Sequence, residues 1–128
     1  MTDDGPSFEV SDRPERRYTA AGGVEYEGEA AFLLKPVPGR TVDDLEDLLR
    51  QGLAADRYVI GDWFDLPLPT LLVRDHEVGT AFRVVVRQGR IELHLLPDTD
   101  TGALAALYRR LRETGSVNWQ VDRRVEAP

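Results

Sequence analysis

The segment 81–96 holds two runs of aliphatic and β-branched residues on either side of Gln88-Gly89. A glycine in a two-residue turn supplies the positive φ that a tight hairpin needs, so the segment predicts a β-hairpin. Counting outward from the turn gives the register of both strands and places only apolar residues on one face, which must pack against a core. The facing pairs on that side are Val86 with Ile91, Val84 with Leu93, and Phe82 with Leu95.

The same register gives the second face of the hairpin a mixed, largely charged character. We expect this face to look at water or at a partner, as the outer face of an antiparallel sheet commonly does. Its facing pairs are Arg83 with His94, Val85 with Glu92, and Arg87 with Arg90.

Composition limits the classes of protein to which the chain can belong. Its 128 residues are enough for one domain with its own core, and the absence of cysteine excludes thiol, disulfide and zinc-thiolate chemistry. A formal net charge of −7 argues against nucleic acid as the main partner and favours basic proteins or segments. Lys35 is the only lysine, an arginine bias that is typical of a high-GC genome, while the acidic excess is typical of salt adaptation.

Residues 1–7 are expected to form a disordered tail, and residues 8–126 a single domain. The N-terminus is acidic and polar where a signal peptide would be basic and then apolar. No apolar run approaches the roughly 20 residues that cross a bilayer. The sequence therefore predicts a cytoplasmic protein with no membrane contact.

Hydrophobic periodicity predicts two helices in addition to the strands. Thr41 is expected to cap a helix that begins at Val42, and a second helix is expected over 103–114, with Gly115 in the left-handed conformation beyond its end. Besides the hairpin, strands are predicted at 8–10, 18–21, 24–35, 70–74 and 117–122, with 58–60 as a short strand or a packed return.

This order of elements fits an α+β two-layer sandwich. The expected sheet is mainly antiparallel, with a three-strand meander over 70–96 plus flanking strands, and two amphipathic helices cover one of its faces. The open face would display charged and apolar side chains together, which is compatible with the docking of a partner.

Residues 61–69 are predicted to form an extended, irregular loop, because two prolines spaced by one residue restrict the backbone. Two interpretations remain open. The loop either folds back to cap one end of the core, the commoner outcome for aromatic residues, or forms a hydrophobic rim for a ligand or partner. Its large apolar side chains are Trp63, Phe64, Leu66 and Leu68, and its expected turn residues are Asp62 and Asp65.

The sequence contains no Gly-rich phosphate loop, nucleophile elbow or His-Glu-x-x-His zinc motif. The run Asp75-His76-Glu77 predicts a solvated turn, because adjacent strand residues point to opposite faces and could not converge on a metal ion. The acidic residues at the start of the first helix are explained by the helix dipole. We therefore expect no metal and no cofactor.

Two hypotheses of function follow. The first is a non-catalytic protein-binding or adaptor domain that self-associates or binds another protein; its candidate interaction surface comprises Trp63, Phe64, Leu66, Arg83, Arg87, Glu92 and His94. The alternative is a small-molecule enzyme or ligand-sensing domain with a pocket between sheet and helices. Beside His94, Glu92 and Arg83, the pocket candidates of this alternative are Asp62, Asp65 and His76.

Overall fold

The computed structural model describes residues 7–8, 10, 13–18, 20, 24–65, 69–115 and 117–126, with the backbone alone described at 17, 24–26, 62–65 and 69. Most of the predicted tail at 1–7 therefore lies outside the described residues.

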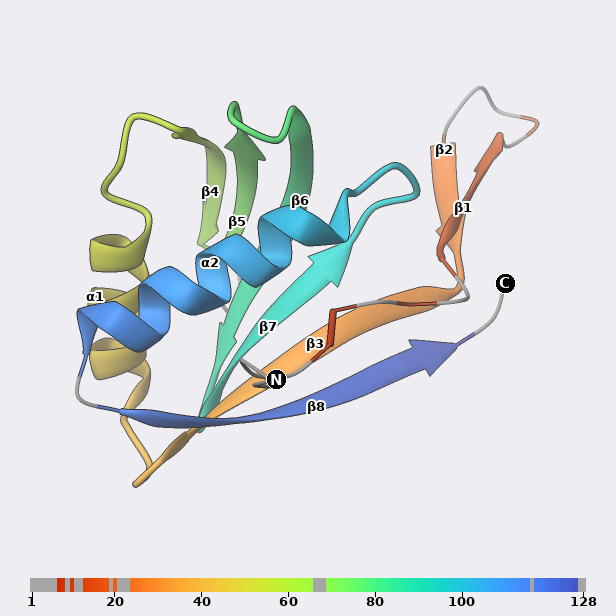
Figure 1. Cartoon of the computed structure of the whole chain (residues 1–128). Coiled ribbons are helices and arrows are strands. Elements are labelled where there is room, and N and C mark those ends of the chain that lie inside the picture. Colours follow the sequence, from red (N-terminus) through yellow and green to blue (C-terminus); the bar gives the residue numbers. More distant parts are fainter. Residues whose placement is uncertain are drawn as a thin grey trace, which may run out of the picture.

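One layer of the structure is a six-stranded antiparallel sheet with the strand order β4-β5-β6-β7-β3-β8. A separate two-stranded hairpin precedes β3 in the chain and projects beside its first residues (Figure 1). Strand β3 lies between β7 and β8, so an early strand is the neighbour of two late ones. The strands are β1 (Glu15–Tyr18), β2 (Val24–Glu27), β3 (Glu29–Val37), β4 (Tyr58–Asp65), β5 (Pro69–Asp75), β6 (Thr80–Arg87), β7 (Arg90–Leu95) and β8 (Asn118–Glu126).

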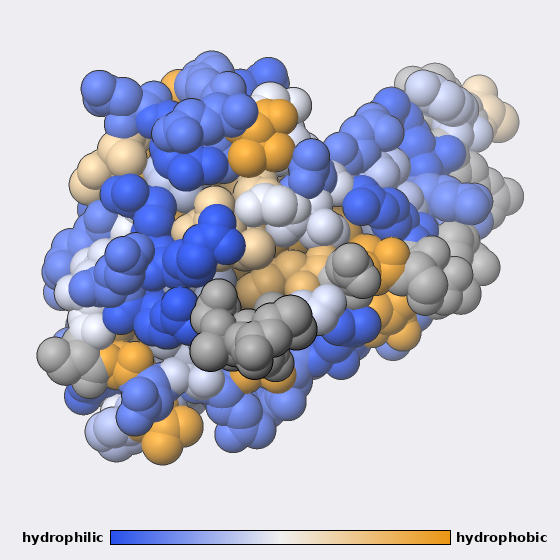
Figure 2. Space-filling model, in the orientation of Figure 1, coloured by the Kyte–Doolittle hydropathy of each residue, from blue (hydrophilic) through white to orange (hydrophobic). Residues whose placement is uncertain are grey.

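The second layer consists of helices α1 (Val42–Gly52) and α2 (Thr101–Thr114), which pack against one face of the sheet. The predicted α+β two-layer sandwich is confirmed. Seen from the helix side, the surface is largely hydrophilic, with scattered hydrophobic residues (Figure 2). No described helix covers the opposite face, which we call the helix-free face. In the described part of the chain, no helix has the length and apolar character needed to cross a membrane.

Both helices begin at side-chain caps. The hydroxyl of Thr41 accepts a hydrogen bond from the backbone N–H of Asp44 at 3.1 Å, as predicted. The carboxylate of Asp100 accepts one from the N–H of Gly102 at 2.8 Å, so α2 begins slightly earlier than the apolar periodicity indicates.

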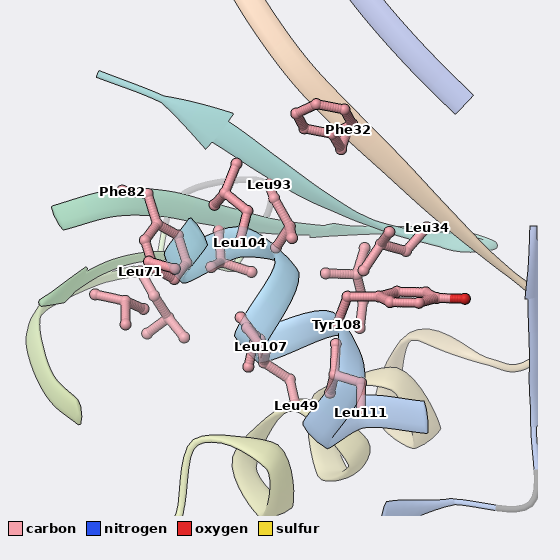
Figure 3. Packing of buried hydrophobic residues seen from close by; sticks show 14 of the residues in the cluster. Phe32, Leu34, Leu49, Leu71, Phe82, Leu93, Leu104, Leu107, Tyr108 and Leu111 are labelled. Atoms are coloured by element: carbon pink, nitrogen blue, oxygen red, sulfur yellow. The ribbon is translucent and has the colours of Figure 1, made fainter. Parts of the chain in front are cut away.

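The core fills the space between the sheet and the helices (Figure 3). Phe8 adds to it from the N-terminal segment, with its ring centroid 4.7 Å from that of Phe32 and 5.5 Å from that of Tyr108. The predicted edge strand at 8–10 is therefore wrong, because neither described residue of that segment is in a strand and Phe8 is buried in the core. Among the described residues the first strand is β1, at 15–18; of the strand predicted at 18–21, residues 19 and 21 lie outside the described residues.

The predicted strand 24–35 is two strands. Gly28, with a φ of 86°, separates β2 from β3, a conformation that favours glycine. Strand β3 then continues through Pro36, which faces Trp119 of β8. Proline is tolerated there because the pairing of β3 with β7 ends at Leu34.

The predicted loop at 61–69 is wrong for residues 61–65, which belong to strand β4. Its pairing with β5 continues to Asp65, although the register shifts between Ile60 and Trp63. Such a β-bulge interrupts the period-two alternation of side chains, which is why the sequence pattern did not indicate a strand. The rest of the predicted loop, 66–68, lies outside the described residues.

The predicted left-handed conformation of Gly115 is also wrong, since its φ is −121° and its ψ is 161°. A Cβ atom at this position would lie 2.7 Å from Cδ2 of Leu48 on α1. The glycine is therefore explained by the close approach of the chain after α2 to α1. At the other helix, a Cβ atom at Gly52 would lie 2.8 Å from Cδ2 of Leu111.

Candidate functional site

The hairpin formed by β6 and β7 has the register that the sequence predicts, with every facing pair in place. Gly89 adopts a φ of 82° in the turn, and the apolar face of the hairpin is buried. The charged face of the hairpin consequently lies in the middle of the helix-free face. Strand β5 flanks it on one side and β3 on the other.

Glu92 is the exception to the expected exposure of this face. It is fully buried, with 0 % of its surface accessible. In register it lies between Val85 of β6 and Leu33 of β3, and Leu33 is itself buried. A carboxylate in such a place requires partners, because burying an unpaired charge is costly.

Three side chains supply those partners. Arg90 donates a hydrogen bond from Nε to Oε2 of Glu92 at 2.6 Å, and Nε2 of His94 lies 2.8 Å from Oε1. Nε of Arg87 lies 3.0 Å from Oε2. All three come from the hairpin itself, so the turn at Gln88-Gly89 is what brings them around one carboxylate.

The ionisation of Glu92 follows from these contacts. Burial alone would raise its pKa, but the hydrogen bonds from His94 and Arg90 and the nearby charge of Arg87 outweigh burial and lower the pKa to about 2. Glu92 is therefore a carboxylate at neutral pH and can only accept hydrogen bonds. It follows that Nε2 of His94 carries the hydrogen. Nδ1 of His94 lies 3.8 Å from the carboxylate of Glu29.

Arg87 is held by charge more than by hydrogen bonding. Its Nε atom is buried near Glu92, yet the N–H is not aligned for a hydrogen bond to any described residue. The side chains of Arg87 and Arg90 are 40 % and 29 % exposed. Among the described residues, none forms a hydrogen bond with an Nη group of Arg87 or Arg90. Two guanidinium groups are thus fixed through Nε, and their Nη donors are not used by any described residue.

Strands β5 to β7 give the helix-free face a positive charge. The register places four arginines on their outer side, against Glu92 as the one carboxylate among the described side chains. On β3 and β8 both signs are present: Lys35 lies 2.7 Å from Asp122, Arg124 lies 3.6 Å from Glu29, and Glu126 faces Glu29 in register. We call the outer surface of β5 to β7 the arginine face; its members are Leu72, Arg74, Arg83, Val85, Arg87, Arg90, Glu92 and His94.

Apolar side chains are exposed beside these arginines. Leu72 of β5 is 38 % exposed, and Val59 of β4, which faces Arg74, is 51 % exposed. Gly61 lies across from Leu72, and a Cβ atom there would be 3.3 Å from Cβ of Leu72. Glycine at this position leaves Leu72 uncovered from the side of β4.

The structure brings together four of the seven residues of the predicted interaction surface. Arg83, Arg87, Glu92 and His94 belong to the arginine face. Trp63 and Phe64 lie in β4, where the backbone of Phe64 faces Thr70, but their side chains and all of Leu66 are outside the description. The same holds for the side chains of Asp62 and Asp65, so the choice between core cap and hydrophobic rim stays a prediction.

The predicted solvated turn at 75–77 is correct for His76 and Glu77, which are exposed, and wrong for Asp75, which is fully buried. Asp75 is ion-paired with Arg57 at 2.8 Å and accepts the N–H of Glu77 at 3.0 Å. The turn closes over the carboxylate because these donors lie around it. In the part of the chain described, no three His, Asp or Glu side chains are placed to hold a metal ion.

Leu72 and Arg74 belong to the surface but were not among the predicted site residues. The signal was present, since Leu71 and Val73 alternate with them as core residues of the same strand. Arg90 had been placed on the open face without being assigned to the site. Arg90 belongs to the site because it donates a hydrogen bond to Glu92, which is buried. No pattern in the sequence indicates that burial.

Two cavities bear on the alternative of a small-molecule site. One of about 150 Å³ lies next to Arg83, His94 and Glu29, and another of about 350 Å³ lies against α1, away from His94. Small-molecule pockets usually measure about 300–1,000 Å³. The cavity next to the titratable cluster is thus smaller than a typical ligand pocket.

Comparisons of the chain with family models, with curated proteins and with solved structures give no match. Its function must therefore be inferred from its own geometry.

Proposed function

We propose that this chain is a non-catalytic protein-binding domain, and that the arginine face is its docking surface. It would act as an adaptor in the cytoplasm, binding another protein or a second copy of itself. The proposed location rests on the net charge of −7, which suits a protein that must stay dispersed at high concentration.

The observation that carries this proposal is the buried carboxylate of Glu92 beneath two arginines. Long side chains lose conformational entropy when a partner immobilises them, at about 0.5–1.5 kcal/mol each. Arg87 and Arg90 are already held through Nε, so part of their side-chain entropy is lost when the chain folds and not when a partner binds. Such preorganisation benefits a surface that must bind, whereas a merely solvated face gains nothing from it.

The composition of the arginine face supports the same conclusion. Arginine is enriched at protein interfaces because its planar group makes several hydrogen bonds and also stacks on apolar surfaces. Here the arginines stand beside Leu72 and Val59, which are exposed. An apolar contact ringed by directional donors is the usual arrangement of a docking surface.

The small-molecule alternative has weaker support. The space between sheet and helices, where it requires a pocket, holds the packed apolar core (Figure 3). The cavity beside His94, at about 150 Å³, has room for little more than a few water molecules.

Native mass spectrometry of the untagged protein, isolated from its own source at physiological salt, tests the proposal. We expect a complex with another protein chain or a homo-oligomer. Surface labelling of arginine in that complex should then protect Arg87 and Arg90 and leave Arg109 of α2, which is exposed, as reactive as in the free protein.

Two results would contradict the proposal. If the protein is a bare monomer at all concentrations, it binds neither another protein nor a second copy of itself. A retained small mass that leaves on denaturation would favour the ligand-sensing alternative.

A further inference from the structure

We infer that the segment that docks on the arginine face is acidic, a stretch of another protein rich in aspartate and glutamate. This inference rests on the proposed function and adds the chemical class of the partner.

The arginine face carries a local positive charge. Among the described side chains on the outer side of β5 to β7 there are four arginines, Arg74, Arg83, Arg87 and Arg90, and one carboxylate, that of Glu92, which is buried and already engaged. The sign is opposite to that of the whole chain, which has a net charge of −7. A basic segment attracted by the overall charge would therefore meet like charges at this face, whereas an acidic one is complementary to it.

Two arginines of this face are arranged to bind carboxylates. Arg87 and Arg90 face each other across the hairpin, and both lie against Oε2 of Glu92 through Nε. The Nη groups, which make no hydrogen bond within the described chain, form the pair of donors that a carboxylate binds in bidentate fashion. Glu92 thus fixes two carboxylate-binding groups side by side.

The same charges exclude a face-to-face pairing of two copies. A twofold contact through the arginine face would bring the four arginines of one copy against those of the other, and like charges in an interface are strongly unfavourable. The occupant is therefore a different surface, and the observations favour a separate acidic segment.

The test is binding of a fluorescein-labelled decaglutamate peptide to the full chain, measured by fluorescence anisotropy at low and at physiological salt. We expect binding that weakens as salt rises, because exposed charges are screened. The double variant R87Q/R90Q should bind about tenfold more weakly. The control R50Q/R109Q, which removes the same charge from the two helices, should change the affinity less than about twofold.

Further variants separate binding from folding. R87Q/R90Q leaves the buried Glu92 without its arginines, which destabilises the fold, so R87Q/R90Q/E92Q removes the carboxylate as well. R74Q/R83Q changes the same face without touching the Glu92 cluster in any contact described. Both should keep the circular dichroism spectrum of the parent and lose affinity for decaglutamate.

Several outcomes would overturn the inference. These are equal losses in R50Q/R109Q and R87Q/R90Q/E92Q, equally tight binding of decalysine, or displacement of the peptide by inorganic phosphate at equal charge concentration. Self-association that is lost in R74Q/R83Q would identify an acidic surface of a second copy as the occupant and would also overturn it.

The two proposals fail separately. If native mass spectrometry finds a protein partner but decaglutamate does not bind, the proposed function is supported and the inference of an acidic segment is contradicted. Decaglutamate binding at the arginine face without any protein partner would show that the face binds carboxylates but would remove the proposed protein-binding function.

Discussion

Asp75 and Arg57 form an ion pair in which the carboxylate is fully buried and the guanidinium is largely so. Nη2 of Arg57 lies 2.8 Å from Oδ2 of Asp75, and Nε donates to Oδ1 at 3.2 Å. The backbone N–H groups of Glu77 and Val78 also donate to Oδ1. One side chain therefore ties the residue before β4 to the turn after β5.

Asp75→Ala should destabilise the protein by about 3 kcal/mol, because removing one partner leaves a mostly buried guanidinium and two turn amides unsatisfied. The midpoint of urea unfolding, followed by circular dichroism, measures the loss. Asp56→Ala, at an exposed neighbouring position, should change stability by less than about 0.5 kcal/mol. Equal midpoints for the two variants would show that the ion pair contributes nothing.

The stability of the protein should fall as pH drops from about 4.5 to about 2, the range between the ordinary pKa of glutamate and that of Glu92 in the folded state. The folded-state pKa is the lower one, so the unfolded chain binds the proton first and acid favours unfolding. Asp122, whose pKa is lowered by the hydrogen bond from Lys35, acts in the same direction. The groups that face Glu92 are Arg87, Arg90 and His94.

Glu92→Gln isolates the contribution of that carboxylate. Urea unfolding measured from pH 2 to pH 6 should show a flatter profile for the variant, with a difference on the order of 3 kcal/mol across the range. At neutral pH the variant should be less stable than the parent, since two arginines lose their counter-charge. Parallel profiles would mean that Glu92 titrates alike in the folded and unfolded states.

Thr41→Ala should cost about 1 kcal/mol, because the N–H of Asp44 loses the acceptor that caps α1. Thr41→Ser keeps the hydroxyl and should restore most of the stability. Thermal unfolding of the three proteins at one pH is the measurement. Identical melting temperatures would show that the Thr41 cap does not stabilise the protein.

Gly89→Ala should destabilise the hairpin by about 1–2 kcal/mol, because alanine is strained at a φ of 82°. No atom lies within 4 Å of a Cβ built there, so the effect is one of backbone conformation alone. Gly39→Ala is the matched control, since its Cβ is equally uncrowded and its φ is not positive. A loss of stability in Gly39→Ala as large as in Gly89→Ala would contradict this explanation.

Gly115→Ala should cost about 1 kcal/mol, because its Cβ would collide with Leu48 where α1 and the end of α2 meet. In a Leu48→Ala background the same change should be close to neutral, since the colliding methyl group is gone. A double-mutant cycle on urea unfolding gives the coupling energy. Additive effects would show that the two residues do not constrain each other.

The sequence alone determined the β6–β7 hairpin and the start of α1. A turn glycine and a period of two are properties of consecutive residues, so the pairs from Val86 with Ile91 to Phe82 with Leu95 could be counted from the turn. The Thr41 cap is equally local. From such elements the α+β sandwich followed, together with the part of the candidate site that lies on β6 and β7.

The sequence pattern failed where structure depends on distant residues. The bulge between Ile60 and Trp63 is stable because β5 pairs with both sides of it, so the local pattern indicated only the start of β4, at 58–60, and not its continuation to Asp65. Gly115 was assigned to a left-handed cap because nothing near it in the chain indicates that Leu48 lies against it.

Only the tertiary structure decided that Glu92 is buried. Alternation places it on the outer side of β7, and local sequence would leave it in water. Insertion of β3 between β7 and β8 brings Leu33 against it on one side, while the arginines and the histidine of the hairpin close around its carboxylate. Side-chain direction is set by the stereochemistry of neighbouring residues, but burial depends on which strand becomes the neighbour, and that choice is made by the packing of the whole chain.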